Sequence, residues 1–310
     1  MAFRDSLQNV KHYAKIISYP CGVQDIIACS DPIFCGSGWE EAENYGFALR
    51  ELAPARDRKE DHSETDLLRS MRRARSQLRK IALANNFRFF VTLTLDSMKV
   101  DRYDPAVIVK KLNAWCSNMV QRKGLRYILV PERHKDGAIH FHGFFNDVLP
   151  MEDSGTVKLA SGGKPRRPRS SKERARWLAA GGQVVYNLPG WSLGYTTALE
   201  LYGEYPAAVA YVCKYIGKDG EKIAGRWYYS GGDLKGPKVE FAELSIEELK
   251  DHFGGKCLEF AVPGRKIAVV NPCYSPHFLS SLYHTPSSKN HFLQFFRQYH
   301  STFHKIFSLP

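Results

Sequence analysis

Two short apolar segments flank an Asp-Gly dipeptide near the middle of this 310-residue chain. Residues 126–132 read RYILVPE and residues 138–146 read AIHFHGFFN, and such β-branched and aromatic residues favour strands. Asp136-Gly137 between them is typical of a tight hairpin turn, because glycine adopts a positive φ without strain. The fold is therefore expected to contain an antiparallel strand pair at this point.

Similar patterns predict further strands and helices on both sides of this pair. The further strands are expected at residues 87–95, 191–201 and 226–230. The helices, which have apolar residues at helical spacing or a proline near their start, are expected at residues 67–81, 104–124 and 206–218. Helices interspersed in this way among antiparallel strands predict an α+β fold, with the helices beside the sheet.

The charge balance of the chain points to an anionic partner. There are 44 Lys and Arg residues against 32 Asp and Glu residues, a formal net charge of +12. Such a surplus is typical of proteins that bind nucleic acid and less often of proteins that bind an anionic membrane surface. The polar face of the expected helix at residues 67–81 either faces solvent or contacts phosphates. That face carries Arg69, Arg72, Arg73, Arg79 and Lys80.

Residues 151–183 differ in composition from their surroundings. They contain eight Lys or Arg residues against three Asp or Glu residues, together with several Gly and Pro residues. This composition predicts a mobile basic insertion, which is either a DNA clamp or a solvated loop. We divide the chain accordingly into residues 1–62, a domain at residues 63–235 that contains the insertion, and residues 236–310, with no role assigned to the first and last parts.

The sequence favours a cytoplasmic protein that does not contact a membrane. No apolar run is long enough to form a transmembrane helix, and the N-terminus lacks the apolar core of a signal peptide. The seven cysteines are scattered along the chain, which argues against a disulfide framework and for free thiols in a reducing compartment.

A candidate metal site lies in the expected hairpin. His140 and His142 are two residues apart on a strand, so both side chains point to the same face. Glu132 lies on the paired strand, where the turn would bring it opposite His142 or a neighbouring position. One carboxylate and two imidazoles suit Mn²⁺ or Mg²⁺ with positions left open for water and phosphate. His134 has the same parity as Glu132 and is a competing candidate closer to the turn.

A second candidate group lies in the expected helix at residues 206–218. Tyr211 and Tyr215 are four residues apart and would be neighbours on one helix face, as would Lys214 and Lys218. A tyrosine can act as a covalent nucleophile when a metal ion or a cation assists loss of its proton. A nearby lysine favours the phenolate form and can neutralise charge on a phosphoryl group. An amphipathic helix with half-buried tyrosines is the alternative.

Three segments, taken in order, resemble the motifs of a known family. They are residues 90–95 (FVTLTL), Glu132 with His140-Phe-His142, and residues 211–218 (YVCKYIGK). Together they resemble the rolling-circle replication initiators known as HUH endonucleases, named for two histidines that flank a hydrophobic residue. The paired tyrosines and the wording VPERHKDGAIHFHG of residues 130–143 are most similar to initiators of filamentous and related single-stranded-DNA bacteriophages.

The resemblance implies a fold and a mechanism. The fold would be a ferredoxin-like, RNA-recognition-type α+β domain. His140, His142 and Glu132 would hold Mg²⁺ or Mn²⁺, which polarises the scissile phosphate. Tyr211 or Tyr215 would attack a phosphodiester, remain joined to the 5′ phosphate and leave a free 3′ hydroxyl, and the other tyrosine could act at termination so that the strands are rejoined.

The resemblance also implies supporting roles and partners. Lys214 and Lys218 would position phosphate or metal-bound water, and Thr92 and Thr94 would support the sheet beside the site. The partner would be single-stranded DNA at a replication origin, in the cytoplasm of a bacterial host. The chain has no G-x-x-x-x-G-K-[ST] sequence for an ATPase loop, so a host helicase is expected besides a host polymerase.

Two other functions fit the same residues. The protein could be a non-catalytic single-stranded nucleic-acid-binding module, in which the tyrosines stack on bases. It could also be a metal-dependent hydrolase that uses water as the nucleophile, with no covalent step.

Overall fold

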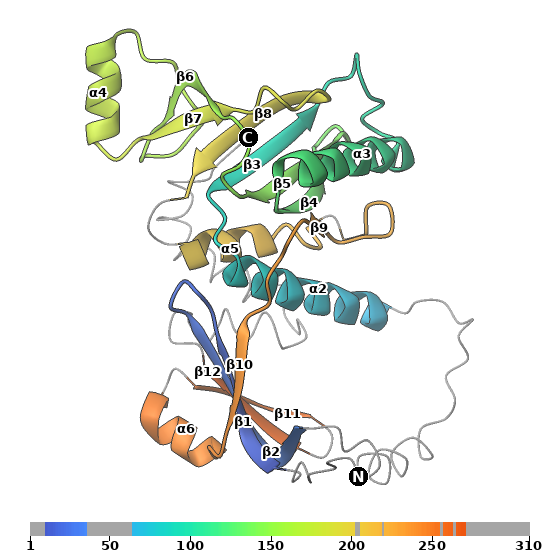
Figure 1. The fold of residues 1–310 in the computed structure, drawn as a ribbon, viewed down its shortest axis with the longest axis vertical. Coiled ribbons are helices and arrows are strands. Elements are labelled where there is room, and N and C mark those ends of the chain that lie inside the picture. The colour runs from blue at the N-terminus through green and yellow to red at the C-terminus, as the bar shows by residue number, and fades with distance from the viewer. Residues whose placement is uncertain are drawn as a thin grey trace, which may run out of the picture. The chain divides into compact units, whose positions relative to one another are not determined.

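The computed structural model describes residues 10–35, 64–201, 205–218, 220–254, 257–262 and 265–270. These residues fall in two compact units. One unit takes in Met1–Leu68 and Pro237–Tyr283, and the other takes in Arg69–Gly236 and His284–Pro310. Each unit contains its own antiparallel sheet with helices beside it (Figure 1), which confirms the expected α+β class.

The sheet of the second unit has seven strands. In chain order they are β3 (Phe89–Leu95), β4 (Tyr127–Arg133), β5 (Ile139–Phe145), β6 (Glu152–Lys158), β7 (Gln183–Asn187), β8 (Gly194–Glu200) and β9 (Tyr229–Gly231). Their order across the sheet is β6-β7-β8-β3-β5-β4-β9, and each neighbouring pair is antiparallel. The expected hairpin is confirmed as β4 and β5, which lie near the centre of this order.

Helix α3 (Pro105–Lys123) covers one face of this sheet. The Asp104 side chain caps its first turn by accepting hydrogen bonds from the backbone N–H groups of Ala106 and Val107. Gly124 ends the helix in the left-handed conformation, at φ 70°. Both ends therefore lie where the sequence predicts them, and the apolar stripe of α3 packs against the sheet. The buried residues of that stripe are Ile108, Leu112, Trp115 and Cys116.

Odd-numbered residues of β3 and β5 face α3, and this alternation decides which side chains remain for the opposite face. Leu93 and Phe141 are fully buried in the core beneath α3. Burial of one such side chain contributes about 1.5–3 kcal/mol. Even-numbered residues of both strands, among them His140 and His142, therefore point to the other face of the sheet.

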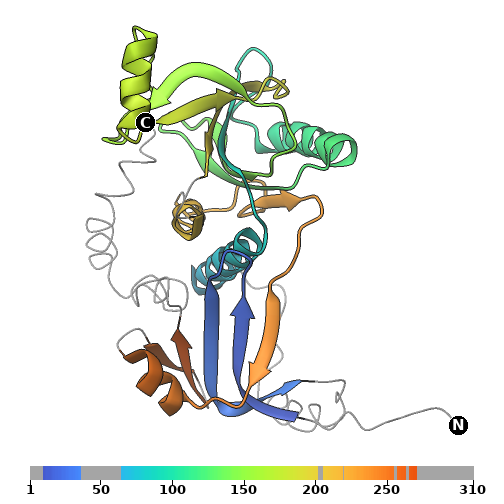
Figure 2. The same cartoon turned by 60° about the vertical axis from the view of Figure 1, so that its left-hand side comes forward.

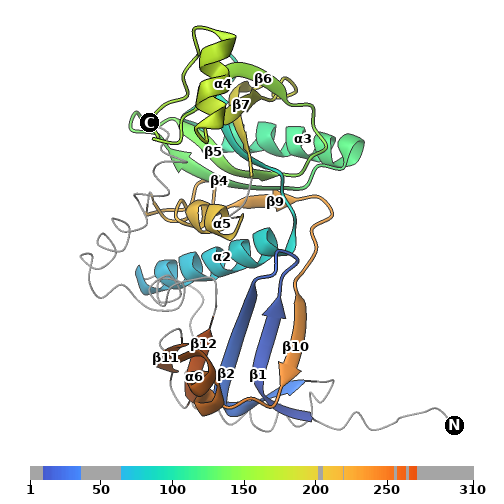
Figure 3. The same ribbon diagram turned by 90° about the vertical axis from the view of Figure 1, so that its left-hand side faces the viewer.

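Helix α5 (Tyr205–Cys213) packs on that other face, between the sheet and helix α2 (Glu64–Ala84), as Figures 1 and 3 show. The Tyr205 hydroxyl donates hydrogen bonds to the carbonyl oxygens of Ala82 (2.6 Å) and Asn85 (2.8 Å) at the end of α2. The Arg75 guanidinium of α2 donates to the carbonyl of Ile216, just beyond α5, at 2.7 Å. These bonds fix α5 and the turn that follows it.

The sheet of the first unit is built from both ends of the described chain. Its strands are β1 (Val10–Ser18), β2 (Gln24–Cys35), β10 (Lys238–Ala242), β11 (Cys257–Val262) and β12 (Arg265–Val270), in the order β10-β1-β2-β12-β11 (Figure 2). Helix α6 (Ile246–Phe253) packs on one face and buries Ile246 and Leu249 against Ala14 and Ala28. Parts of residues 1–62 and 236–310, to which we assigned no role, thus form one sheet.

The expectation that residues 151–183 form a mobile insertion is wrong. This segment supplies β6, helix α4 (Ser171–Ala179) and the start of β7, which extend the sheet beyond β8 (Figure 1). An antiparallel bridge between Val157 and Arg166 fastens the intervening loop to β6. Backbone hydrogen bonds in the sheet therefore outweigh the Gly- and Pro-rich composition on which the prediction rested.

Two details of the expected helices also need correction. The helix expected to reach Lys218 ends at Cys213, and a turn follows it. Gly217, at φ +78°, lies in that turn, where residues with side chains rarely adopt such a backbone conformation. In α2, Arg79 is only 2% exposed, so the face to which we assigned it is not uniformly open to solvent or to phosphates.

The expected state of the cysteines is confirmed for the residues described. Cys21, Cys29, Cys116, Cys213 and Cys257 are free thiols. A separate finding concerns the helices of the described residues: each is too short or too polar to cross a membrane.

Candidate metal and tyrosine site

The β4–β5 hairpin places the three expected metal ligands together. Glu132 pairs with His140 in the antiparallel register, and Val130 pairs with His142. The turn is held by a hydrogen bond from the His134 N–H to the Ala138 carbonyl, at 2.8 Å. Because paired residues of antiparallel strands point to the same face, the Glu132 carboxylate lies beside both imidazoles.

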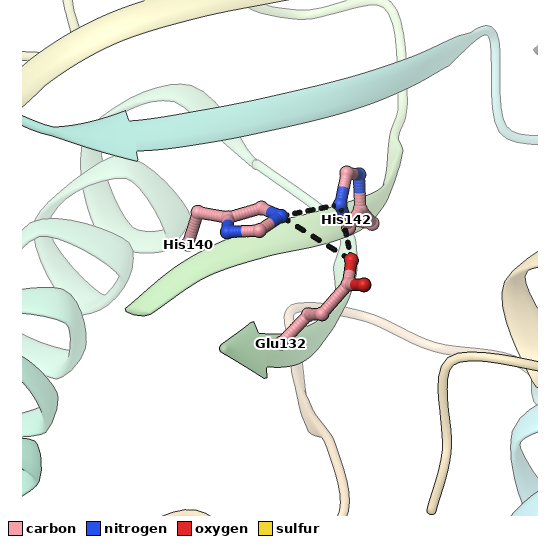
Figure 4. Close-up of side chains that lie close together, drawn as sticks. All are labelled: Glu132, His140 and His142. Carbon is pink, nitrogen blue, oxygen red and sulfur yellow. Dashed lines mark hydrogen bonds and ion pairs between the residues drawn. The ribbon is translucent and has the colours of Figure 1, made fainter. Parts of the chain in front are cut away.

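The distances within this group are short. Glu132 Oε2 lies 3.2 Å from Nε2 of His140 and 2.8 Å from Nε2 of His142, and the two Nε2 atoms are 2.8 Å apart (Figure 4). All three residues are buried, with exposures of 4%, 8% and 3%. One oxygen and two nitrogens thus point at a common centre, and the group could hold a metal ion.

The protonation of His142 suits a metal ligand. Burial, with a contribution from His140 and His134, holds the pKa of His142 well below its usual value, so the ring is neutral at pH 7. Its Nδ1 lies 3.1 Å from the Thr92 hydroxyl on β3. A ring that donates its Nδ1 proton to this oxygen keeps the lone pair of Nε2 for a cation. The residues present therefore fit a divalent metal ion.

The two tyrosines lie against the same group. The Tyr215 ring stacks on the His142 ring, with centroids 4.4 Å apart and planes at 18°. The Tyr215 hydroxyl donates a hydrogen bond of 2.5 Å to the Tyr211 hydroxyl. Although Tyr215 lies beyond the end of α5, its position four residues after Tyr211 still brings the two phenols together.

The two lysines have different surroundings. The Lys218 ammonium forms an ion pair with Glu132 Oε1, the oxygen that does not face the histidines. The Lys214 ammonium lies over the Tyr211 ring, 4.6 Å from its centroid, and burial lowers the pKa of Lys214. The structure therefore brings all seven residues singled out in the sequence into one cluster: Glu132, His140, His142, Tyr211, Lys214, Tyr215 and Lys218.

The competing candidate His134 lies at the edge of this cluster. Its side chain is exposed and its ring centroid is 5.1 Å from that of His140. The group of ligand atoms that converge contains Glu132 and not His134.

Sequence reasoning missed two residues that shape the site. Thr92, which we expected only to support the sheet, contacts His142 directly. Phe90 lies beneath both His142 and Tyr211, with ring centroids 6.1 Å and 6.0 Å away. The even parity that Phe90 and Thr92 share on β3 is the sequence feature that could have placed them on the face of the histidines.

Comparison with known proteins agrees with this site. No curated protein and no solved structure matches the chain. Residues 88–220 match the model of a protein family described as replication-associated protein ORF2. The matched residues include the whole Glu–His–His, tyrosine and lysine cluster, and the match supports a replication initiator that acts on DNA at an origin.

Proposed function

We propose that the protein is a metal-dependent DNA endonuclease of the HUH type that starts rolling-circle replication. It nicks one strand of single-stranded origin DNA, becomes joined to the 5′ phosphate through a tyrosine, and later rejoins strands. The observation that carries the proposal is the stacking of Tyr215 on His142, because it places two phenols beside a group of metal-ligand type. A phage or plasmid replicon that depends on host helicase and polymerase, in the bacterial cytoplasm, would use such an enzyme.

Glu132, His140 and His142 would hold Mg²⁺ or Mn²⁺. When bound, the ion supplies positive charge that polarises the scissile phosphate. Thr92 keeps His142 oriented, and the stacked Tyr215 and Phe90 rings limit the movement of the imidazole. Lys218 holds the second oxygen of Glu132 and remains half-exposed, so it can reach a DNA phosphate beside the group.

The chemical step exchanges one ester bond for another. A phenol oxygen attacks phosphorus, the bond from phosphorus to the 3′ oxygen breaks, and the 3′ oxygen leaves as a hydroxyl after it takes up a proton. We assign the first attack to Tyr211, because it accepts the hydrogen bond from Tyr215 and has the Lys214 ammonium over its ring. Both contacts stabilise negative charge on Tyr211. Tyr215 then serves in the second transfer.

The test uses single-stranded oligonucleotides of random sequence, labelled at either end, with the full chain and Mn²⁺. Tyrosine attack in the proposed direction leaves the 3′-end label on a protein–DNA adduct that survives denaturation and releases the 5′-end label on a free fragment. The double variant Tyr211→Phe with Tyr215→Phe should form no adduct. Tyr103→Phe, which alters an exposed tyrosine outside the cluster, is the matched control.

The other outcomes separate the alternative functions. Cleavage without an adduct would indicate a hydrolase that uses water, and binding without cleavage would indicate a non-catalytic module. An adduct that persists in the double variant would refute the assignment of the nucleophile. His140→Ala should lose metal-dependent cleavage while DNA binding changes little, because dispersed Lys and Arg residues supply most of the salt-sensitive affinity.

A further inference from the structure

The segment between β6 and β7 carries a dense group of exposed cations. We call residues 159–182, which contain α4, the basic arm. Its exposed cations are Lys164, Arg166, Arg167, Arg169, Lys172 and Arg176. In Figures 1 and 3, α4 lies beside β6 and β7 at the end of the sheet.

The basic arm has a defined conformation. The Arg166 backbone exchanges two hydrogen bonds with Val157 of β6, at 2.8 Å and 3.0 Å. The ammonium of the buried Lys158 donates to the Gly163 carbonyl at 2.6 Å. Pro165 and Pro168 restrict the backbone on both sides of Arg166. A partner that binds these cations would therefore lose little affinity to ordering of the loop.

Most of these cations have no acidic partner within the protein. Arg174 pairs with Asp153, and Arg176 lies 3.7 Å from Glu173. In the described part of the chain no carboxylate pairs with the remaining exposed ammonium and guanidinium groups of the arm, which belong to Lys164, Arg166, Arg167, Arg169 and Lys172. Neighbouring cations repel one another, so this arrangement is stabilised when a polyanion binds.

The sheet connects the basic arm to the metal-ligand group. Glu132, His140, Thr94 and Tyr195 form one cross-strand row on β4, β5, β3 and β8. Tyr195 is 67% exposed on the same face as the histidines. With strands about 4.8 Å apart, Tyr195 lies about 10 Å from His140 along this row, in the direction of β7, β6 and the arm.

We propose that the basic arm binds the phosphodiester backbone of single-stranded nucleic acid that leaves the metal-ligand group across Tyr195. The exposed phenol ring offers a base a stacking surface, and unpaired guanidinium groups beyond it match a row of phosphates. An anionic membrane fits less well, because helices that bind membranes expose a large apolar face. The bulky apolar residues of α4, Trp177 and Leu178, are instead partly buried.

The test measures binding of the full chain to a long single-stranded oligonucleotide by fluorescence anisotropy at several salt concentrations. EDTA is present throughout, so the result does not depend on whether the protein cleaves DNA. Arg166→Gln with Arg169→Gln should lower the slope of log affinity against log salt by about 1.4 and weaken binding roughly tenfold at low salt. Lys110→Gln with Arg122→Gln, on the exposed side of α3, is the charge-matched control and should bind as the wild type does.

A second variant tests the path across the sheet. Tyr195→Ala should weaken single-strand binding by roughly fivefold or more and leave the salt slope unchanged, because stacking contributes about 1–3 kcal/mol per base. Equal losses in the arm variant and the control variant would refute the inference. So would a loss confined to duplex DNA of the same length, or a loss confined to vesicles that contain an anionic lipid.

Discussion

Replacement of Thr92 by valine tests whether the strand next to the hairpin sets the metal affinity. The Thr92 hydroxyl lies 3.1 Å from Nδ1 of His142, and His142 is 3% exposed. Valine keeps the β-branched shape but leaves a buried ring nitrogen without that partner, at a cost of about 1–3 kcal/mol. Because the same bond selects the ring tautomer that presents Nε2, we expect Mn²⁺ to bind about 10- to 100-fold more weakly.

Isothermal titration of the full chain with Mn²⁺ provides the measurement, and thermal unfolding of each metal-free variant shows whether it is folded. Thr94→Val is the matched control, because Thr94 lies on the same strand and face, pairs with His140, and has an exposed side chain. The control should bind Mn²⁺ as the wild type does. Equal affinity of the Thr92→Val and Thr94→Val variants would refute the reasoning.

Three further predictions concern the core, a buried thiol and the ion pair at the site. Phe141→Ala should lower the free energy of unfolding by about 3–5 kcal/mol in urea titrations, because Phe141 is fully buried beneath α3. Burial raises the pKa of Cys213 to about 12, so peptide mapping should show Cys213 unmodified by iodoacetamide at pH 8 while the part-exposed Cys21 reacts. Lys218→Gln removes a cation that competes for Glu132 and should strengthen Mn²⁺ binding up to about fivefold; unchanged or weaker binding would count against that competition.

The hairpin and its ligands were predictable because they depend on local rules. Alternation along β5 puts His140 and His142 on one face, and the Asp136-Gly137 turn fixes the strand that lies opposite. The capped helix α3 was predictable for the same reason, since both of its ends are set by residues close in sequence. These features need no knowledge of contacts between distant parts of the chain.

Features that depend on long-range pairing were not predictable. The strands of the first unit, β1 and β12, join through β2 although more than two hundred residues separate them, and neither has a strong pattern of its own. The end of α5 at Cys213 depends on a hydrogen bond from Arg75 to Ile216, which the local sequence does not indicate. The contact of Thr92 with His142 likewise follows from the order of strands in the sheet.

Burial works against the nucleophile that the proposed reaction needs, and the surroundings divide this cost unequally between the two tyrosines. Burial raises the pKa of both phenols, but the hydrogen bond from Tyr215 lowers that of Tyr211 and the same contact raises that of Tyr215 further. An esterified Tyr211 can no longer carry phenolate charge, so its electrostatic effect on the pKa of Tyr215 is removed after the first transfer. Tyr215 thus becomes easier to deprotonate only once Tyr211 has reacted, and this order suits a reaction in which one tyrosine opens a strand and the other closes it.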